Sequence, residues 1–418
     1  MQKGTRLRLA LAACAAIACL VWARPALARI KLVTLPVRER VEIQLDNPNA
    51  TLVEEERIVT LLQGTNQIDF SWSNTAIDKG TILFRVVEMP LRNKKGDDHP
   101  SMVRPDGKVE MIRVINVAYP PGENALVWEV FAEEPFAAKV RISYLISNLG
   151  RSFNYRAVAE QDESTLALRK YVRLSNFSGE EFGDSGIWAG FGNYFHREVG
   201  MNEAKELLIW RFLKVPIKKT YTFDWWTGQP VPEQPEQRYV EMRYVLNNDK
   251  EHQLGEFPLQ FGKVRIFQKD GRGGEAFIGE DWGKFTPIDD EMKLYLGLAR
   301  DVVVKRKVTR SDRQPVNGNL YHQDIVLQYD VENFKNTAVT LDLNEDMNML
   351  RNTFCGGKDH EAQWEVVPEG TSIGQDRIER KDARTAQFHI PLEGAPKAEG
   401  AKVQPVTVTV HMLLKNEW

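Results

Sequence analysis

Cysteine is scarce in this sequence, with three copies in 418 residues: Cys14, Cys19 and Cys355. The first two fall in an expected N-terminal targeting segment, so the remaining chain keeps Cys355 and can form no internal disulfide. We expect Cys355 to be a small buried hydrophobic residue rather than a reactive thiol. The seven histidines are dispersed, and no two stand at metal-ligand spacing. The composition therefore excludes a disulfide scaffold and predicts neither a metal nor another cofactor.

Long apolar runs are also missing. The one apolar stretch, residues 9–22, is shorter than the roughly 20 residues of a membrane-spanning helix. Basic residues precede it and Ala26-Leu27-Ala28 follows, as in a cleavable signal peptide. Lipidation at Cys14 or Cys19 is the minority alternative, because the lipobox-like segment at residues 11–14 lies too early and apolar sequence continues after it. We expect residues 1–28 to be removed and the rest to be exported to the periplasm or cell surface, with no transmembrane span.

Positive charge is in short supply. Without Lys3, Arg6, Arg8 and Arg24 of the targeting segment, 51 bases face 58 acids. Binding to a phosphate backbone or to anionic lipid requires concentrated Lys and Arg. Nucleic acid is therefore excluded as a partner.

Alternation of period two dominates the rest of the chain. Val41, Ile43 and Leu45 alternate with polar residues, and residues 406–412 repeat the pattern near the end. Such segments are half-buried strands, and turn signals recur between them at short intervals. Residues 201–213 can be a helix or a strand, and the strand is at least as favoured. The pattern predicts an all-β fold of two or three consecutive antiparallel β-sandwich (Ig-like) domains with little helix.

Composition divides the exported part into three segments. Residues 29–145 form an N-terminal β-domain with a polar loop at 92–105, and residues 146–246 form an aromatic-rich middle β-unit. A polar linker is expected at 247–253. Residues 254–418 form a C-terminal β-sandwich domain.

A family resemblance rests on several segments in a fixed order: residues 37–70, 262–267, 277–281, 296–302 and 331–336. In this order the chain resembles bacterial exported β-proteins of unknown function related to mucoidy inhibitor A. The resemblance covers most of the exported part and is strongest at 250–345, whereas residues 347–361 look inserted. It implies sandwich-like domains and a periplasmic or surface role, and it implies no catalytic residue.

Motifs for chemistry are weak. Gly271-Arg272-Gly273-Gly274 lacks the Lys-Ser/Thr pair of a phosphate loop and is expected to be a hairpin turn. Runs of acids, such as Glu54-Glu55-Glu56, should point alternately to opposite sheet faces, away from the paired geometry of a glycosidase. Two polar loops, Asp97–His99 and Cys355–Glu361, could hold a cation if the fold added ligands, although solvated loops are favoured.

Tryptophan is the most informative feature. Trp188, Trp210, Trp225 and Trp226 crowd the middle segment and are the weak binding candidates. An outward Trp can stack on a sugar ring or anchor a protein partner, whereas a buried Trp belongs to the core, and the core is favoured.

The sequence therefore predicts a non-catalytic envelope or surface protein that acts as a structural and binding module. Its expected partner is an envelope protein or a polysaccharide, and a homo-oligomer or larger assembly would suit exposed strand edges. The competing hypotheses are an envelope carbohydrate-active hydrolase using paired carboxylates and a cation-binding structural module.

Overall fold

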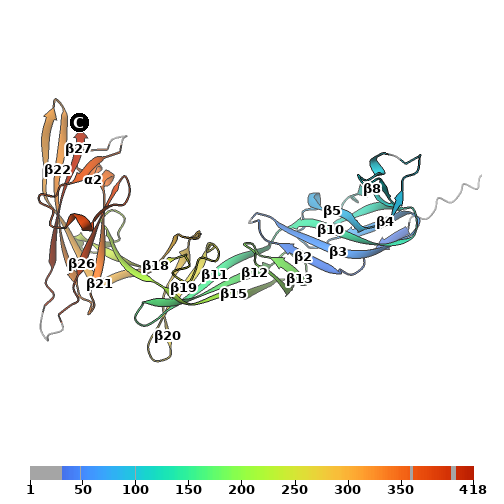
Figure 1. Ribbon diagram of the computed structural model, residues 1–418, viewed down its shortest axis with the longest axis horizontal. Helices are drawn as coiled ribbons and strands as arrows, with labels where there is room; N and C mark the ends of the chain where they lie inside the picture. Colours follow the sequence, from blue (N-terminus) through green and yellow to red (C-terminus); the bar gives the residue numbers. More distant parts are fainter. Residues whose placement is uncertain (1–30, 48, 99, 358–360, 397–401) are drawn as a thin grey trace, which may run out of the picture. The chain divides into compact units, whose positions relative to one another are not determined.

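The computed structural model describes residues 31–47, 49–98, 100–357, 361–396 and 402–418, and it is built almost entirely of strands (Figure 1). The expected targeting segment lies outside the described residues. The all-β prediction is confirmed. The chain divides into two compact units: unit 1 comprises residues up to Arg151 and Leu174–Lys205, and unit 2 comprises Ser152–Arg173 and Glu206–Trp418. The three consecutive segments expected from composition stay a prediction.

Unit 1 is a sandwich of two sheets. The four-stranded sheet has the order β1 (Lys31–Thr34), β4 (Gly64–Ser71), β9 (Ala125–Ala132) and β8 (Ile112–Ala118). The six-stranded sheet has the order β14 (Tyr194–Val199), β13 (Gly183–Trp188), β2 (Arg40–Gln44), β3 (Thr51–Leu61), β10 (Phe136–Ile146) and β5 (Leu83–Glu88). The remaining elements of unit 1 are β6 (Leu91–Asn93), β7 (Lys108–Glu110), η1 (Lys79–Thr81) and η2 (Pro100–Met102).

Aromatic side chains from both sheets fill the core of unit 1. The Trp128 ring of β9 lies 5.7 Å from Phe70 of β4 and 4.7 Å from Phe84 of β5. The Phe70 ring also lies 6.1 Å from Tyr144 of β10. All four are buried. Rings of this size bury large apolar areas, so they hold the two sheets together.

A five-stranded sheet runs mainly through unit 2, in the order β15 (Glu203–Pro216), β12 (Thr165–Asn176), β11 (Leu149–Ala159), β19 (Gly262–Lys269) and β20 (Glu275–Gly283). The segment that allowed helix or strand is the strand β15. The glycine-rich stretch is the turn of the β19–β20 hairpin, as predicted. The predicted linker at 247–253 is a turn that follows β18.

The largest sheet of unit 2 has the order β24 (Gln363–Val366), β27 (Val406–Glu417), β22 (Leu320–Asn333), β21 (Glu291–Asn317), β18 (Gln234–Asn247), β16 (Lys218–Asp224), β23 (Val339–Asp346), β26 (Thr385–Leu392) and β25 (Ile378–Arg380), with β17 (Pro230–Val231) paired to β18. Its alternate residues meet in one core, which α2 (Met347–Phe354) covers with Met347 and Leu350. The short η3 (Gln375–Arg377) precedes β25. Asp346 caps α2 by accepting a hydrogen bond from the Met349 N–H.

Candidate functional site

Trp188 is one of the tryptophans that the sequence offers as binding candidates, and polar and aromatic side chains hold its ring in place. It ends β13, and its Nε1 donates a hydrogen bond to Glu42 Oε2 at 2.9 Å. Tyr194 of β14 stands opposite Trp188 in the register, and the two ring centroids are 4.4 Å apart. The Tyr194 hydroxyl donates to Glu42 Oε1 at 3.1 Å. The indole is therefore held by a carboxylate and a neighbouring ring while 42% of Trp188 stays exposed.

Charged side chains of β2, β3 and β10 lie around this indole, and Arg85 of β5 joins them through an ion pair. Arg40 pairs with Glu42 at 2.7 Å, Arg141 pairs with Glu56 at 2.5 Å, and Arg85 pairs with Glu54. A cavity of about 170 Å³ lies among them. We call this region the Trp188 surface; its members are Arg40, Glu42, Gln44, Glu54, Glu56, Arg141, Trp188 and Tyr194.

The ion pairs of the Trp188 surface stabilise its charges. Burial of Glu56 disfavours its ionised form, but the hydrogen bond and charge of Arg141, together with Lys139, outweigh burial and lower its pKa. The hydrogen bond to Glu42 raises the pKa of Arg40. Glu56 and Arg40 therefore stay ionised at neutral pH. Glu42, Glu54 and Glu56 each have a guanidinium beside them.

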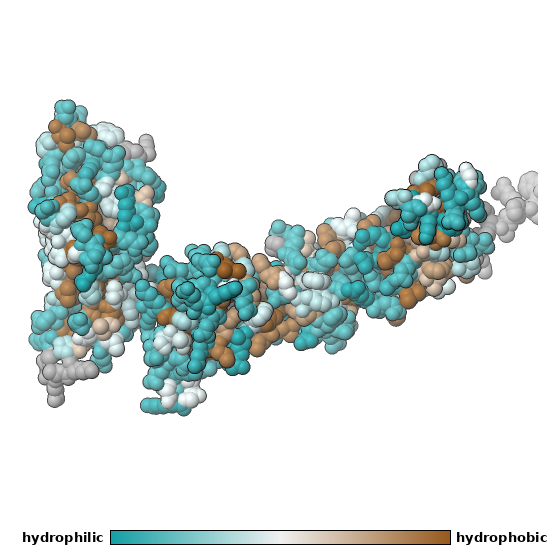
Figure 2. All heavy atoms as spheres, viewed as in Figure 1, coloured by the Kyte–Doolittle hydropathy of each residue, from teal (hydrophilic) through white to brown (hydrophobic). Residues whose placement is uncertain are grey.

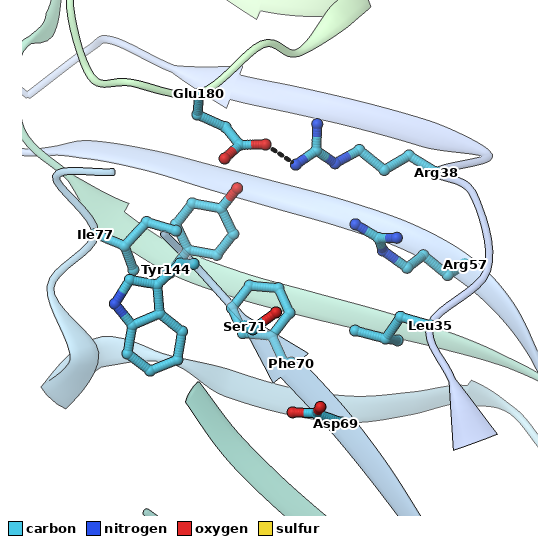
Figure 3. A pocket seen from close by; sticks show the side chains of 10 residues that line it. Leu35, Arg38, Arg57, Asp69, Phe70, Ser71, Ile77, Tyr144 and Glu180 are labelled. Carbon is cyan, nitrogen blue, oxygen red and sulfur yellow. Dashed lines mark hydrogen bonds and ion pairs between the residues drawn. The ribbon is translucent and has the colours of Figure 1, made fainter. Parts of the chain in front are cut away.

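The middle acid of the run, Glu55, points to the opposite face of β3, as the alternation predicted. Its carboxylate is fully buried, accepts from the Tyr144 hydroxyl at 2.6 Å, and pairs with Arg38 at 2.9 Å and Arg57 at 2.6 Å. Arg38 also pairs with Glu180 (Figure 3). Burial and the Glu55 charge raise the pKa of Tyr144 far above its usual range, so the phenol stays protonated.

Glu55 and its partners Arg38, Arg57 and Tyr144 form what we call the Glu55 cluster. The three partners line a cavity of about 260 Å³ (Figure 3). Arg57 also donates to the Pro36 carbonyl, and Arg38 donates to the Glu181 carbonyl at 2.6 Å. The two guanidinium groups are thus largely occupied by protein acceptors. We interpret the cluster as a tie between the β1–β2 connection, the loop before β13 and the sheet, rather than as a ligand site.

Trp210 lies on β15 at the end of the five-stranded sheet. Its ring packs 4.7 Å from Phe257 and 6.4 Å from Phe212. Among the described strands, β15 pairs with β12 alone, so one edge of β15 carries no partner strand. Leu208 and Leu213 on the same strand are 52% and 57% exposed. Figure 2 shows hydrophobic residues gathered over the region where β15 runs.

Trp225 and Trp226 lie in the turn after β16 and face the core of the large sheet. The Trp226 Nε1 donates to Glu345 Oε2 at 3.1 Å. The Trp225 ring lies 4.9 Å from the Arg306 guanidinium carbon and 4.2 Å from that of Arg238. Their contacts are accounted for by packing and cation–π attraction within unit 2.

One exposed aromatic pair escaped the sequence analysis. Phe261 and Trp282 stack with centroids 5.1 Å apart and planes 4° apart, and Lys263 lies over Trp282. The sequence carries a signal for this exposed pair, because Lys263, Arg265 and Phe267 alternate along β19 and so predict a strand face turned to solvent. Tyr194 and Glu42 were not singled out either, since their contact with Trp188 depends on strand pairing.

The two candidate cation loops are described only in part. In the first, Asp98 is bound by Arg92 at 2.6 Å and by the Lys95 N–H, and His99 lies outside the described residues. In the second, residues 358–360 lie outside the described residues, Cys355 is half-buried, and Glu361 pairs with Arg384. In the described part of the chain, no three His, Cys, Asp or Glu side chains gather as a metal site would require.

Comparison of the sequence with known protein families and with curated proteins finds no match. Within the described ranges, no helix has both the length and the hydropathy needed to cross a membrane. Function must therefore be inferred from the chain's own residues.

Proposed function

We propose that this chain is an exported, non-catalytic structural and binding module of the bacterial cell envelope, which joins a protein assembly by strand addition at β15. The observation that carries the proposal is the open edge of β15 with its exposed apolar side chains. The expected targeting segment and the family resemblance support the envelope location.

An open strand edge presents unpaired N–H and C=O groups to which another extended chain can bind. Edges that must stay free usually carry bulges, prolines or charges, or are covered. The edge strand β8 has a register shift between Val114 and Asn116. At the far end of the five-stranded sheet, β20 lies against β21, where the Tyr295 N–H donates to Asp281 at 2.7 Å. β15 also carries charged residues and ends in Pro216, but its stretch from Leu207 to Trp210 is wholly apolar. Leu208 and Leu213 stay exposed beside its edge.

Side chains would add affinity to the backbone hydrogen bonds. Full burial of one large apolar side chain contributes roughly 1.5–3 kcal/mol, and the half-exposed residues of β15 have about half of that left to gain. Alternate side chains would set the register, because neighbours along a strand point to opposite faces. A partner strand with apolar residues opposite Leu208 and Trp210 fits this edge.

The carboxylates support a non-catalytic module. A hydrolase with two acids needs one carboxylic acid and one carboxylate free to face the substrate. Here Glu55, Glu56 and Glu280 are each paired with Arg or Lys. These partners lower the pKa values of Glu56 and Glu280, so neither carries the proton that a general acid must supply. Turnover of an envelope glycan by the purified chain would contradict this part of the proposal.

A photo-crosslinking amino acid placed at position 213 tests the proposed docking edge of β15 in cells that produce the protein. We expect an adduct of one defined mass from Leu213, and no adduct from Phe277, an exposed residue of β20 in the same sheet. Leu208→Pro should abolish the adduct, because proline removes an N–H and does not fit a paired strand. Hydrogen exchange on the purified complex should show slower exchange of β15 amides. Equal adducts from both positions, or unchanged exchange in β15, would refute strand addition.

A further inference from the structure

We propose that the Trp188 surface of unit 1 is a second binding site, which holds a neutral hexopyranose glycan. This inference goes beyond the protein-docking edge and uses none of its residues. It rests on the aromatic pair, the balanced ring of charges and the cavity that lies between them.

The aromatic pair provides a platform that is fixed before any ligand arrives. One face of a pyranose ring carries C–H groups and is apolar, so it gains from contact with an exposed indole. The Trp188 N–H is already satisfied by Glu42, and Tyr194 supports the indole ring. Little side-chain freedom remains to be lost on binding, which favours affinity.

The polar groups around the platform match sugar hydroxyls. A hydroxyl both donates and accepts, so it needs acceptors and donors close together. Glu54 and Glu56 supply acceptors, Arg141 supplies donors, and Gln44 supplies both. The cavity of about 170 Å³ between them is of a size suited to one sugar ring rather than to a folded partner. Neighbouring units of a polymer would lie outside it on the sheet.

Charge balance selects a neutral glycan over an acidic one. Glu42, Glu54 and Glu56 are matched by Arg40, Arg85 and Arg141. Lys139, which also lies beside Glu56, is matched by Glu88, so the formal charges of these eight groups cancel. An anionic polymer would gain little net attraction and would have to displace the carboxylates from their guanidinium partners. A neutral sugar can bridge these pairs and leave them intact.

Gly186 of β13 makes room for this arrangement. A Cβ at this position would lie 2.5 Å from the Tyr194 hydroxyl and 2.6 Å from Glu42 Oε1, which is closer than atoms can approach. Gly186→Ala must therefore displace the two groups that hold Trp188, without removing either ring. The variant therefore tests whether binding requires the two rings to be held in this position or only to be present.

Titration calorimetry with the full exported chain tests the site, using maltohexaose, cellohexaose and chitohexaose as neutral probes and polygalacturonate as the acidic one. We expect at least one neutral probe to bind and polygalacturonate to bind at least tenfold more weakly. Trp188→Ala should weaken binding at least tenfold, and Gly186→Ala should weaken it severalfold. Tyr194→Phe, which keeps the ring but loses its bond to Glu42, should have a smaller effect.

Trp282→Ala is the matched control, because Trp282 is 53% exposed and stacks on Phe261 in unit 2. This variant should keep full glycan affinity, as should Leu208→Pro, which disrupts the protein-docking edge. Unchanged circular dichroism will show that each variant folds. The proposal is overturned if no neutral probe binds at millimolar concentration, or if Trp282→Ala loses as much affinity as Trp188→Ala. Neither result bears on strand addition at β15.

Discussion

Removing Arg306 should destabilise unit 2, because it leaves a buried carboxylate without its charge partner. Glu345 is fully buried, and its Oε1 lies 2.6 Å from the Arg306 Nε. The Tyr329 hydroxyl donates to the same oxygen at 2.5 Å, and Trp226 donates to the other oxygen at 3.1 Å. Arg306→Met removes the charge and its hydrogen bonds while roughly preserving the length of the side chain.

The size of the effect follows from these contacts. Breaking a buried ion pair by removing one partner costs about 3–5 kcal/mol. Tyr329 and Trp226 still solvate Glu345, so the electrostatic loss should lie near the lower end, about 3 kcal/mol. Loss of the Arg306 cation–π contact with Trp225 adds about 0.5–1 kcal/mol. Replacing Glu345 by Gln in the same chain removes the stranded charge and should recover about 2 kcal/mol.

The loss of stability that Arg306→Met causes in unit 2 should also depend on pH. Burial raises the pKa of Glu345, against the opposing effects of Arg306, Tyr329 and Trp226, and without Arg306 the pKa must rise further. A carboxyl whose pKa is higher in the folded state binds more protons when folded, so its stabilising contribution is lost as pH rises through that pKa. Arg306→Met should therefore lie closer to the wild type at pH 5 than at pH 8.

Hydrogen exchange in a urea series, read by mass spectrometry, measures each unit separately. Peptides from β22 and β23 should exchange at lower urea in Arg306→Met, and peptides from β3 in unit 1 should not shift. The reasoning is refuted if Arg306→Met costs less than about 1 kcal/mol, or if the double variant is no more stable than the single one.

Two further predictions concern acid stability and thiol reactivity. Hydrogen bonds from Arg92 lower the pKa values of Asp98 and Glu133, so their contribution is present above the ordinary carboxyl pKa of about 4 and is lost as pH falls further. Urea midpoints of unit 1 between pH 3 and 7 should fall less steeply with acid in Arg92→Met, and an unchanged slope would contradict this. Burial raises the pKa of Cys355 to about 11. Iodoacetamide at pH 8 should therefore label Cys355 at least roughly 100-fold more slowly in the native chain than in urea, and equal rates would refute its burial.

Period-two alternation predicted much of the fold, because each sheet buries one face. Val41, Ile43 and Leu45 are buried as expected, and so are Val408 and Val410. The segment at 201–213 stayed ambiguous from sequence because its apolar residues fit either period. Pairing with β12 makes it a strand.

Only part of the Trp188 surface could be predicted from the sequence. Trp188 was identified as a candidate by composition, and Glu54 and Glu56 were correctly placed on one face of a strand. Glu42 stands 146 residues from Trp188, and the two meet because β13 pairs in parallel with β2. Parallel pairing between distant strands leaves no local pattern in a single sequence. The same parallel pairing hid the ion pair of Arg38, which precedes β2, with Glu180, which precedes β13.

The 27-residue strand β21 affects how unit 2 should resist a pulling force. Its first part pairs antiparallel with β18, and the part from Val302 onward pairs antiparallel with β22. Backbone hydrogen bonds of such ladders run perpendicular to the strands, so tension along β21 loads many of them in shear at once. The four-residue edge strand β24, pulled along its own axis, has far fewer such bonds to share the load. Resistance to pulling in unit 2 is thus concentrated along one strand.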